Sequence, residues 1–324
     1  MKKGYAIDKD QFSKKYLNIQ YANKSDLNCL DLYLPEGEGP YPLIMLVHGG
    51  GFMGGYKDQG SIFGVGKVVS QGYALAAVDY RLSLHCNWPE PVHDVKCAIR
   101  YLRANQQKYN IAADNIVLWS SSAGAAIAQA VAATGDKQEY EEYNDISMGY
   151  PEESSAIQGL ISIYGVADFV SGAAFDNLKP REFYLSVCGP TPADEELYMN
   201  QEYVDAVELI LGYHLNNIEN VIKAAKNSPF ALAKGDYPPA LFQHGTADPV
   251  APFSDSVNVA VKVNELAGEE RVIFEMFEGA THGGHVFWQN ENIERGLDFI
   301  DGILFGEKRQ RMPFPELKII EISN

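Results

Sequence analysis

Three polar side chains that suit acyl transfer stand just after predicted strands: Ser122, Asp248 and His282. A serine hydroxyl is a poor nucleophile near neutral pH, because its proton must leave as the oxygen attacks. A histidine can take that proton, and an acidic group can orient the imidazole and stabilise its charged form. The order Ser, Asp, His is the one expected when the serine lies on a sharp strand-to-helix turn. These residues therefore predict catalysis by a nucleophilic serine.

The segment that carries the serine, residues 116–128, reads IVLWSSSAGAAIA. It begins as an apolar, strand-like run and ends as an alanine-rich helix, with three serines at the junction. Gly124 sets the register: as the small residue two positions past the apex, it assigns the apex to Ser122 and the small residue before it to Ser120. The usual pattern is Gly-x-Ser-x-Gly, so Ser120 is a departure. The alternatives are Ser120 or Ser121 as nucleophile, or serines that only cap a helix.

The acid candidate, Asp248, follows the apolar run 240–244 and precedes a proline. Its position just past a strand suits an acid that orients a histidine. The alternative is that Asp248 caps the helix expected from residue 253 or holds a turn, since aspartate commonly bonds the backbone two residues on.

The base candidate, His282, follows the predicted strand 272–277 within a glycine-rich loop. His285 competes for the role. We prefer His282, because it follows the strand more closely and is flanked by a glycine. We interpret His48 as a structural residue of a glycine loop, and His244 as a residue inside a strand.

A run of glycines follows the buried strand predicted at 43–47, where residues 48–55 read HGGGFMGG. Glycine loses the most backbone entropy on folding, so three adjacent glycines indicate that something approaches this backbone closely. A phosphate is one candidate, but the chain lacks the phosphate-loop pattern and the context of a dinucleotide site. With a serine apex downstream, we favour an oxyanion bound by backbone N–H groups. A purely structural turn is the alternative.

Apolar runs alternate with amphipathic segments along most of the chain, which predicts one doubly wound, mostly parallel sheet with helices on both faces. The predicted strands are 18–21, 29–34, 43–47, 73–78, 116–119, 160–164, 240–244 and 272–277. The predicted helices are 62–71, 91–107, 123–133, 253–267 and 293–305. The carboxyl ends of parallel strands share one edge, so the three polar side chains should meet there.

The stretch 167–234 breaks this alternation and is too long for one crossover. It contains aromatic-bearing helical pieces at 192–211 and 217–225, and we expect it to form a cap over the strand ends, where a substrate would bind. An extra helical layer that does not touch substrate is the alternative. The expected organisation is a single domain, 1–324, with this cap inserted.

Three further stretches lie outside the alternation. Residues 1–17 are polar with aromatic interruptions and predict a loosely attached arm, and residues 136–155 predict an acidic surface insertion. In the tail, 306–324, only 317–322 has strand character, and it could pair locally or with a partner chain.

Four short stretches together resemble the α/β-hydrolase superfamily, and within it the acetyl esterase, carboxylesterase and hormone-sensitive-lipase-like branch. They are HGGG at 48–51, SAG at 122–124, HGTAD at 244–248 and GATHG at 279–283. The sequence DYRL at 79–82 and the stretch 88–94 are similar to that branch too. The resemblance covers roughly residues 30–305 and implies an α/β-hydrolase fold.

The resemblance also implies a role for each matching residue. Ser122 would attack the acyl carbonyl, His282 would act as general base and then acid, and Asp248 would orient His282. The backbone N–H groups of Gly50, Gly51 and Ala123 would form the oxyanion hole. The departures are Ser120, and Ala125 where the family often has a second glycine; neither removes a reacting group.

These residues predict a serine esterase that acts on a small-molecule ester with a short, acetyl-type acyl group. Relatives that act on acetylated or feruloylated sugars share the Asp-Pro-Val segment at 248–250, so such saccharides are the expected niche. The alternatives are an amide hydrolase, either a peptidase or a formamidase, with the same triad, and a non-catalytic binding protein on the same fold.

The composition bounds the partners. The chain has 26 basic and 43 acidic residues, a net charge of −17, which disfavours nucleic acid. No apolar run is long enough to span a membrane, and the N-terminus lacks a signal peptide's apolar core, so we expect a cytoplasmic protein. The four cysteines are far apart and predict reduced thiols rather than a metal or redox site. No cofactor is expected, and the oligomeric state, monomer or homodimer, stays open.

Overall fold

An eight-stranded, mostly parallel sheet crosses the centre of the computed structural model, which describes residues 3–176, 179–180 and 203–323. The strand order is β11-β10-β7-β6-β4-β5-β3-β2, with the last two strands antiparallel to their neighbours. The strands are β2 (Lys14–Gln20), β3 (Cys29–Leu34), β4 (Tyr41–Val47), β5 (Ala74–Val78), β6 (Ile111–Ser121), β7 (Gly159–Ile163), β10 (Ala240–Gly245) and β11 (Val272–Phe277). The predicted fold class is confirmed.

Burial explains why these runs form strands. The residues of β3, β5 and β7 are all buried, as expected of strands covered on both faces, whereas β11, the outermost strand, is mostly half-buried or exposed. In the register between β4 and β6, Val47 pairs with Ser120. The carboxyl end of β4, where the glycine run begins, therefore lies beside the serine-rich end of β6.

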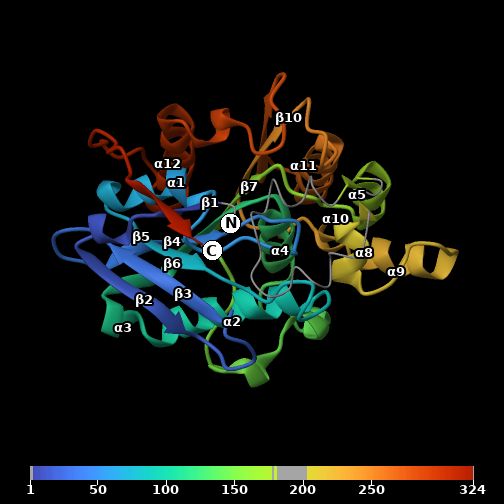
Figure 1. The fold of residues 1–324 in the computed structure, drawn as a ribbon, viewed down its shortest axis with the longest axis horizontal. Helices are drawn as coiled ribbons and strands as arrows, with labels where there is room; N and C mark the ends of the chain where they lie inside the picture. The colour runs from blue at the N-terminus through green and yellow to red at the C-terminus, as the bar shows by residue number, and fades with distance from the viewer. Residues whose placement is uncertain (1–2, 177–178, 181–202, 324) are drawn as a thin grey trace.

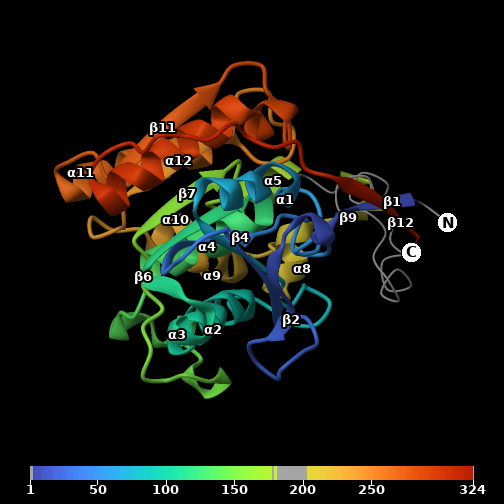
Figure 2. The same ribbon diagram turned by 90° about the vertical axis from the view of Figure 1, so that its left-hand side faces the viewer.

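Helices cover both faces of the sheet (Figures 1 and 2). The apolar residues of α2, α4 and α11 belong to one core, and those of α1, η2 and α12 belong to the other. The bounds are α1 (Ile62–Val65), η2 (Gly66–Gln71), α2 (Glu90–Ala104), α3 (Gln106–Tyr109), α4 (Ser122–Thr134), α11 (Phe253–Ala267), η5 (His285–Trp288) and α12 (Asn290–Phe305). None of the helices in the described residues combines the length and apolar character that crossing a bilayer requires.

The segment predicted as a cap contains α5 (Phe169–Asp176), α8 (Ala206–Leu211), α9 (Ile218–Asn227), α10 (Pro229–Leu232) and the strand pair β8 (Lys179–Pro180) and β9 (Tyr203–Val204). These helices gather at one end of the sheet (Figure 1). Trp88, in the loop after β5, donates its backbone N–H to the carbonyl of Ile210 at 2.7 Å, which ties α8 to the carboxyl edge. Of the predicted helical piece 192–211, residues 192–202 lie outside the described residues. The cap itself stays a prediction.

The N-terminal segment is bound more firmly than the sequence predicts. Its first strand, β1 (Lys3–Ile7), pairs antiparallel with β12 (Ile319–Ser323), so the tail strand pairs within the chain. Ile7 and Phe12 are buried, and the Phe12 ring packs on Tyr33 with centroids 4.5 Å apart. The predicted loose arm is therefore wrong. The two apolar side chains that anchor this segment, Ile7 and Phe12, are isolated among polar residues and form no pattern in the sequence.

The predicted insertion, residues 136–155, contains two short 3-10 helices, η3 (Gln138–Tyr143) and η4 (Ile146–Met148). Its acidic residues lie mostly at the surface, but Tyr143 and Met148 are buried in the core. Two apolar anchors thus hold a segment that shows no helical period in its sequence.

The cysteines that the structure describes, Cys29, Cys86 and Cys97, are buried free thiols. Cys188 lies outside the described residues. Burial raises the pKa of Cys29 and of Cys97 to about 11, so both are held as thiols near neutral pH.

Candidate active site

The turn between β6 and α4 places Ser122 at an apex. The strand ends at Ser121 and the helix begins at Ser122, whose φ of 53° lies in the left-handed region that few non-glycine residues adopt. Two residues on, a Cβ on Gly124 would lie 2.2 Å from the carbonyl oxygen of His48 and 2.4 Å from that of Val47. The helix can therefore pass the end of β4 only with glycine at 124, which is the register that the sequence predicts.

The two neighbouring serines are engaged elsewhere. Ser120 is buried, and its hydroxyl donates to the carbonyl of Ile161 on β7 at 2.9 Å. Ser121 is buried as well, and its Oγ lies 2.8 Å from Oγ of Ser61. A serine is therefore accommodated at position 120, where the usual pattern has glycine, by a bond to the next strand.

Ser122, His282 and Asp248 are brought together by the structure as the sequence predicts. Oγ of Ser122 lies 2.8 Å from Nε2 of His282, and Nδ1 of His282 lies 2.8 Å from Oδ2 of Asp248. A neutral imidazole with its hydrogen on Nδ1 donates to the carboxylate and accepts from the serine hydroxyl. The rival His285 is exposed, and its Nδ1 is 2.9 Å from Nε2 of Gln289.

The carboxylate of Asp248 is surrounded by donors. Oδ1 accepts from the backbone N–H groups of Val250 and Ala251 at 2.7 and 2.9 Å, and Oδ2 lies 3.1 Å from Nε2 of His244 besides its contact with His282. Burial acts to raise the pKa of Asp248, but the hydrogen bonds from His244 and His282 outweigh it and hold that pKa well below its ordinary value. The group is therefore a carboxylate at neutral pH.

The loops that carry Asp248 and His282 are joined by backbone contacts. The N–H of Thr246 donates to Phe277 at 3.1 Å, and that of Ala247 donates to Ala280 at 3.0 Å. A Cβ on Gly245 would lie 2.2 Å from the Ala280 carbonyl, so the close approach of the two loops requires a glycine there. These contacts set the spacing between Asp248 and His282.

Tyr164 is a residue of this site that the sequence reasoning missed. It follows β7 at the same edge, has a φ of 40°, and its ring centroid lies 4.5 Å from that of His282. The ring of Phe287 also packs on Tyr164, with the two ring centroids 5.0 Å apart. The signal in the sequence was position alone, because any residue just past a parallel strand reaches this edge.

The glycine loop after β4 passes beside the serine. A Cβ on Gly49 would lie 3.0 Å from Cβ of Ser122. Gly50 and Gly51 have φ values of 130° and 60°, and the Gly50 carbonyl accepts from two backbone N–H groups farther along the loop, each at 3.0 Å. On the helix side, Ala123 lies in the first turn of α4, where backbone N–H groups have no partner within the helix. The glycine loop and the first turn of α4 thus both lie beside Ser122.

A buried ion pair between Asp79 and Lys57 lies next to the glycine loop and contacts its first residue, His48. Asp79, just past β5, accepts from the backbone N–H of Lys57 at 2.6 Å and from its Nζ at 3.0 Å, and Nε2 of His48 lies 3.5 Å from the same carboxylate. Burial acts to raise the pKa of Asp79, but the bonds and charges of His48 and Lys57 lower it overall. Tyr80 stacks on the His48 ring, with centroids 4.4 Å apart, and donates its hydroxyl to the His48 carbonyl.

Arg81 ties the loop after β5 to helix α2. Its backbone N–H and its guanidinium donate to the buried carboxylate of Asp94 at 2.8 to 3.0 Å, and its Nη1 donates to Glu90 at 2.8 Å. This fork-like geometry fixes both groups. The bonds between Arg81 and Asp94 therefore hold the loop that follows Asp79 against helix α2.

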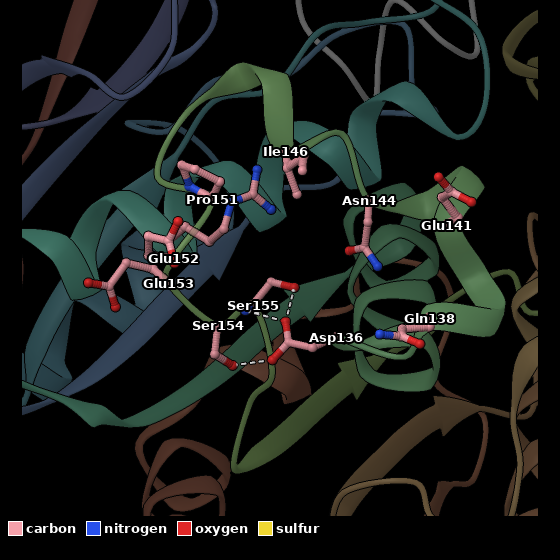
Figure 3. A pocket seen from close by; sticks show the side chains of 11 residues that line it. Asp136, Gln138, Glu141, Asn144, Ile146, Pro151, Glu152, Glu153, Ser154 and Ser155 are labelled. Atoms are coloured by element: carbon pink, nitrogen blue, oxygen red, sulfur yellow. Dashed lines mark hydrogen bonds between the residues drawn. The ribbon is translucent and has the colours of Figure 1, made fainter.

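Two surface hollows are lined by residues other than Ser122, Asp248 and His282. One, of about 800 Å³, lies at the opposite edge of the sheet and is lined chiefly by the insertion 136–155 (Figure 3). Asp136 accepts there from Ser154 and Ser155, while Glu141 lies across the hollow from Glu152 and Glu153 (Figure 3). Among the described residues, no group of three or more His, Cys, Asp or Glu is arranged to hold a metal ion.

The second hollow, of about 930 Å³, is called here the hairpin hollow, because it lies at the turn between β2 and β3. Its lining residues are mostly polar: Gln20, Asn23, Lys24, Ser25, Asp26, Leu27, Tyr56, Leu82 and His85. Since Leu30 at the start of β3 pairs with Val78 at the end of β5, this turn lies at the carboxyl edge of the sheet. The hairpin hollow therefore shares an edge with Ser122.

Comparisons with known proteins agree with this geometry. A sequence model of the BD-FAE family matches residues 30–263. Esterase LipQ of Mycobacterium tuberculosis is 24% identical over 277 residues, 84% of this chain and 58% of that protein. Probable isoprenylcysteine alpha-carbonyl methylesterase ICMEL1 of Arabidopsis thaliana is 28% identical over 256 residues, 79% of this chain and 48% of that protein. The chain thus spans about half the length of the curated relatives it matches.

Among solved structures, a truncated form of a carbohydrate esterase from gut microbiota superposes with a TM-score of 0.71 at 24% identity. The match covers 91% of this chain and 98% of that one. At this identity the likeness is evidence for the fold, which both chains share along nearly their whole length.

Proposed function

The chain belongs to the BD-FAE family of the α/β-hydrolase superfamily, and we propose that it is a serine carboxylesterase that forms an acyl-enzyme on Ser122. One observation carries the proposal: Oγ of Ser122, the ring of His282 and Oδ2 of Asp248 form a continuous chain of two contacts, each 2.8 Å long. Such a chain is what moves a proton away from a serine as it attacks a carbonyl.

In the acylation step, Oγ of Ser122 bonds to the ester carbonyl carbon while its proton passes to Nε2 of His282. Asp248 stabilises the imidazolium that results, because its carboxylate is ionised and already oriented. Collapse of the tetrahedral intermediate breaks the bond to the alcohol, which leaves with the proton from His282. A water then attacks the acyl-enzyme by the same route, releases the acid and regenerates Ser122.

The negative oxygen of the tetrahedral intermediate requires donors, and we assign them to the backbone N–H groups of Gly50, Gly51 and Ala123. The closeness of Gly49 to Ser122 and the place of Ala123 in the first turn of α4 support this assignment. Such donors act without reorganising, and the loss of one typically costs about 3 kcal/mol of transition-state stabilisation.

For the substrate, we propose a short acyl group, of acetyl type, on a saccharide alcohol. The solved carbohydrate esterase from gut microbiota supports the saccharide class. The hairpin hollow supports it too, because side chains such as Asn23, Asp26 and His85 suit the hydroxyl groups of a sugar, and the hollow shares the sheet edge with Ser122. The cap segment lies at that edge as well, and we propose that it shapes the acyl pocket.

The esterase proposal is tested with a p-nitrophenyl ester series from acetate to decanoate, assayed with the wild type and with Ser122→Ala. We expect a maximum at acetate or butyrate and no turnover above background in the variant. Turnover retained in Ser122→Ala would reject the assigned nucleophile. Turnover of a p-nitroanilide in place of every ester would move the proposal to an amide hydrolase.

The saccharide proposal is tested with the double variant Asn23→Ala/Asp26→Ala, whose two side chains are exposed. We expect KM for acetylated xylo-oligosaccharides to rise about tenfold, because two hydrogen bonds to the sugar are lost. The matched control is p-nitrophenyl acetate, which has no sugar and should keep its KM. If the KM of the variant equals that of the wild type for the acetylated xylo-oligosaccharides as well as for p-nitrophenyl acetate, the hairpin hollow is rejected as the sugar site.

A further inference from the structure

His244 is a buried histidine next to the acid of the triad, and the mechanism above does not use it. It lies in β10, no part of its side chain is exposed, and helix α11 covers it. Nδ1 of His244 lies 2.8 Å from Oγ of Ser256 on α11, and Nε2 lies 3.1 Å from Oδ2 of Asp248. A buried imidazole held on both nitrogens is fixed in position.

The partners of His244 define where its hydrogen lies. Nε2 is also 3.2 Å from the carbonyl oxygen of Ala251, and a carbonyl oxygen can only accept. The hydrogen is therefore on Nε2, where it is shared between Oδ2 of Asp248 and the Ala251 carbonyl. In the neutral ring, Nδ1 accepts from the hydroxyl of Ser256. This assignment follows from the bonding partners.

Oδ2 of Asp248 consequently faces two imidazole N–H donors, one from His282 at 2.8 Å and one from His244 at 3.1 Å. Each donor withdraws electron density from the oxygen, so the bond from His244 weakens the pull of the carboxylate on the proton of His282. The same bond also stops the carboxylate from turning about its Cβ–Cγ axis, since both of its oxygens are then held.

We propose that His244 is a positioning residue of the esterase: its Nε2–H holds Oδ2 of Asp248 toward His282 and limits how strongly the carboxylate retains the proton on His282. The inference rests on the proposed function, and His244 itself touches no substrate. As His282 takes the proton of Ser122, its bond to Oδ2 strengthens, and the hydrogen of His244 can shift toward the Ala251 carbonyl. The hydrogen bond from His244 to Asp248 thus weakens when His282 is protonated.

The titratable groups that face this pair belong to elements on every side. His282 comes from the loop after β11 and bonds Asp248, and Tyr164, from the end of β7, packs on the His282 ring. On α11, the carboxylate of Asp255 is bonded to Ser171 and to backbone N–H groups after β7. On the other face of β10, Glu275 is bonded to Gln243. Among these described groups, Asp248 is the one that contacts both imidazoles.

The test compares His244→Gln with His244→Met, two side chains of similar length and volume of which only glutamine can donate to Oδ2. We expect His244→Met to lower kcat/KM for p-nitrophenyl acetate roughly tenfold with KM nearly unchanged, as for the loss of one hydrogen bond to a charged group. In the pH profile of kcat/KM for this variant, the acid limb, where activity falls as the pH is lowered, should move to higher pH by about half a unit to one unit. The reason is that the Asp248 carboxylate binds the His282 imidazolium more tightly when His244 no longer donates to it. His244→Gln should recover most of both effects.

Nitrogen-15 NMR of labelled histidine reads the same coupling without substrate. In the wild type, His244 should show hydrogen on Nε2, and in His244→Met the titration of His282 should move to higher pH as the acid limb does. A wild type that turns over no ester would reject the proposed function, while NMR would still decide the role of His244.

Two outcomes would overturn the proposal. One is a His244→Met enzyme that matches His244→Gln in both kcat/KM and acid limb. The other is hydrogen on Nδ1 of His244 in the wild type, a result that does not require either variant to fold.

Discussion

Two buried carboxylates support the proposed active site in different ways. Asp79, past β5, pairs with Lys57 and holds the glycine loop from behind. Asp248, past β10, faces two imidazoles and holds His282. Both are almost fully buried, and interactions with their partners lower the pKa of each below the ordinary value despite burial.

The difference lies in the partner. The charges of Asp79 and Asp31 outweigh burial and raise the pKa of Lys57 above its ordinary value, so this cation is permanent across the working pH range. An imidazole gains and loses its proton within that range. The Asp79 pair can therefore fix backbone positions but cannot respond to the reaction, whereas in the proposed mechanism the Asp248 cluster gains and loses a proton at His282. Substitutions in the two clusters should differ in what they change.

The largest expected effect comes from Asp248→Asn. Each oxygen of this carboxylate accepts hydrogen bonds from two N–H donors. In the asparagine variant the amide NH2 replaces one oxygen, so in either orientation it faces two N–H groups that have lost their acceptor. His282 would turn or change tautomer, and we expect kcat/KM to fall roughly a thousandfold or more with little change in KM. Steady-state kinetics with p-nitrophenyl acetate measures this. A fall of less than tenfold would contradict the role of Asp248.

Asp79→Asn should act on stability first. It leaves the ammonium of Lys57 buried without its nearest counter-ion, and we expect a loss of about 3 kcal/mol in the free energy of unfolding, measured by urea titration at pH 7. The control is the double variant Lys57→Met/Asp79→Asn, which removes both charges and should lose less than the sum of the two single variants. Additive losses would show that the ion pair is not a unit.

Lys57→Met should have a smaller effect than Asp248→Asn. It should lower kcat, whereas His244→Met should also shift the acid limb of the pH profile. With Nζ gone, the glycine loop is held less firmly but keeps its backbone donors, so we expect kcat to fall about tenfold, less than the roughly hundredfold or more typical of losing an oxyanion donor outright. The acid limb of the pH profile should stay in place, because no donor to Asp248 changes. A shift of that limb comparable to the one expected for His244→Met would erase the distinction between the clusters.

The smallest effect concerns the pH dependence of stability. The pKa of Asp79 is below its ordinary value of 3.8 in the folded protein, so its stabilisation is complete above that value and is lost as the pH falls below it. The Asp79→Asn variant lacks this contribution. The difference in free energy of unfolding between wild type and variant should therefore shrink from pH 6 to pH 3. A difference that is constant over this range would contradict the assignment.

Much of the architecture could be predicted, because buried parallel strands have continuous apolar runs that a sequence displays directly. Strand 29–34, helix 253–267 and strand 272–277 were predicted with the bounds that the structure has. Gly124 gave the register of the elbow for a steric reason, since a Cβ there would meet the backbone of β4. The proximity of Ser122, Asp248 and His282 could be predicted from residue type and from position past strand ends.

What could not be predicted depends on contacts between distant segments. The arm 1–17 looked unattached, because Ile7 and Phe12 are two isolated apolar residues whose partners lie elsewhere in the chain. His244 looked like an ordinary strand residue, since nothing in its neighbourhood indicates that Asp248 turns back to meet it. Lys57 appears in sequence as one more charged loop residue, and its burial is explained by pairing with Asp79 and by the nearby carboxylate of Asp31.

The most direct test of the central claim, an activated nucleophile at Ser122, is covalent trapping. Incubation with diethyl p-nitrophenyl phosphate should transfer the diethylphosphoryl group to Oγ of Ser122 with release of p-nitrophenolate. Peptide mapping by mass spectrometry should then find one adduct, on Ser122, and none in Ser122→Ala. An adduct on Ser120 or Ser121, or an unlabelled protein that still hydrolyses esters, would contradict the account.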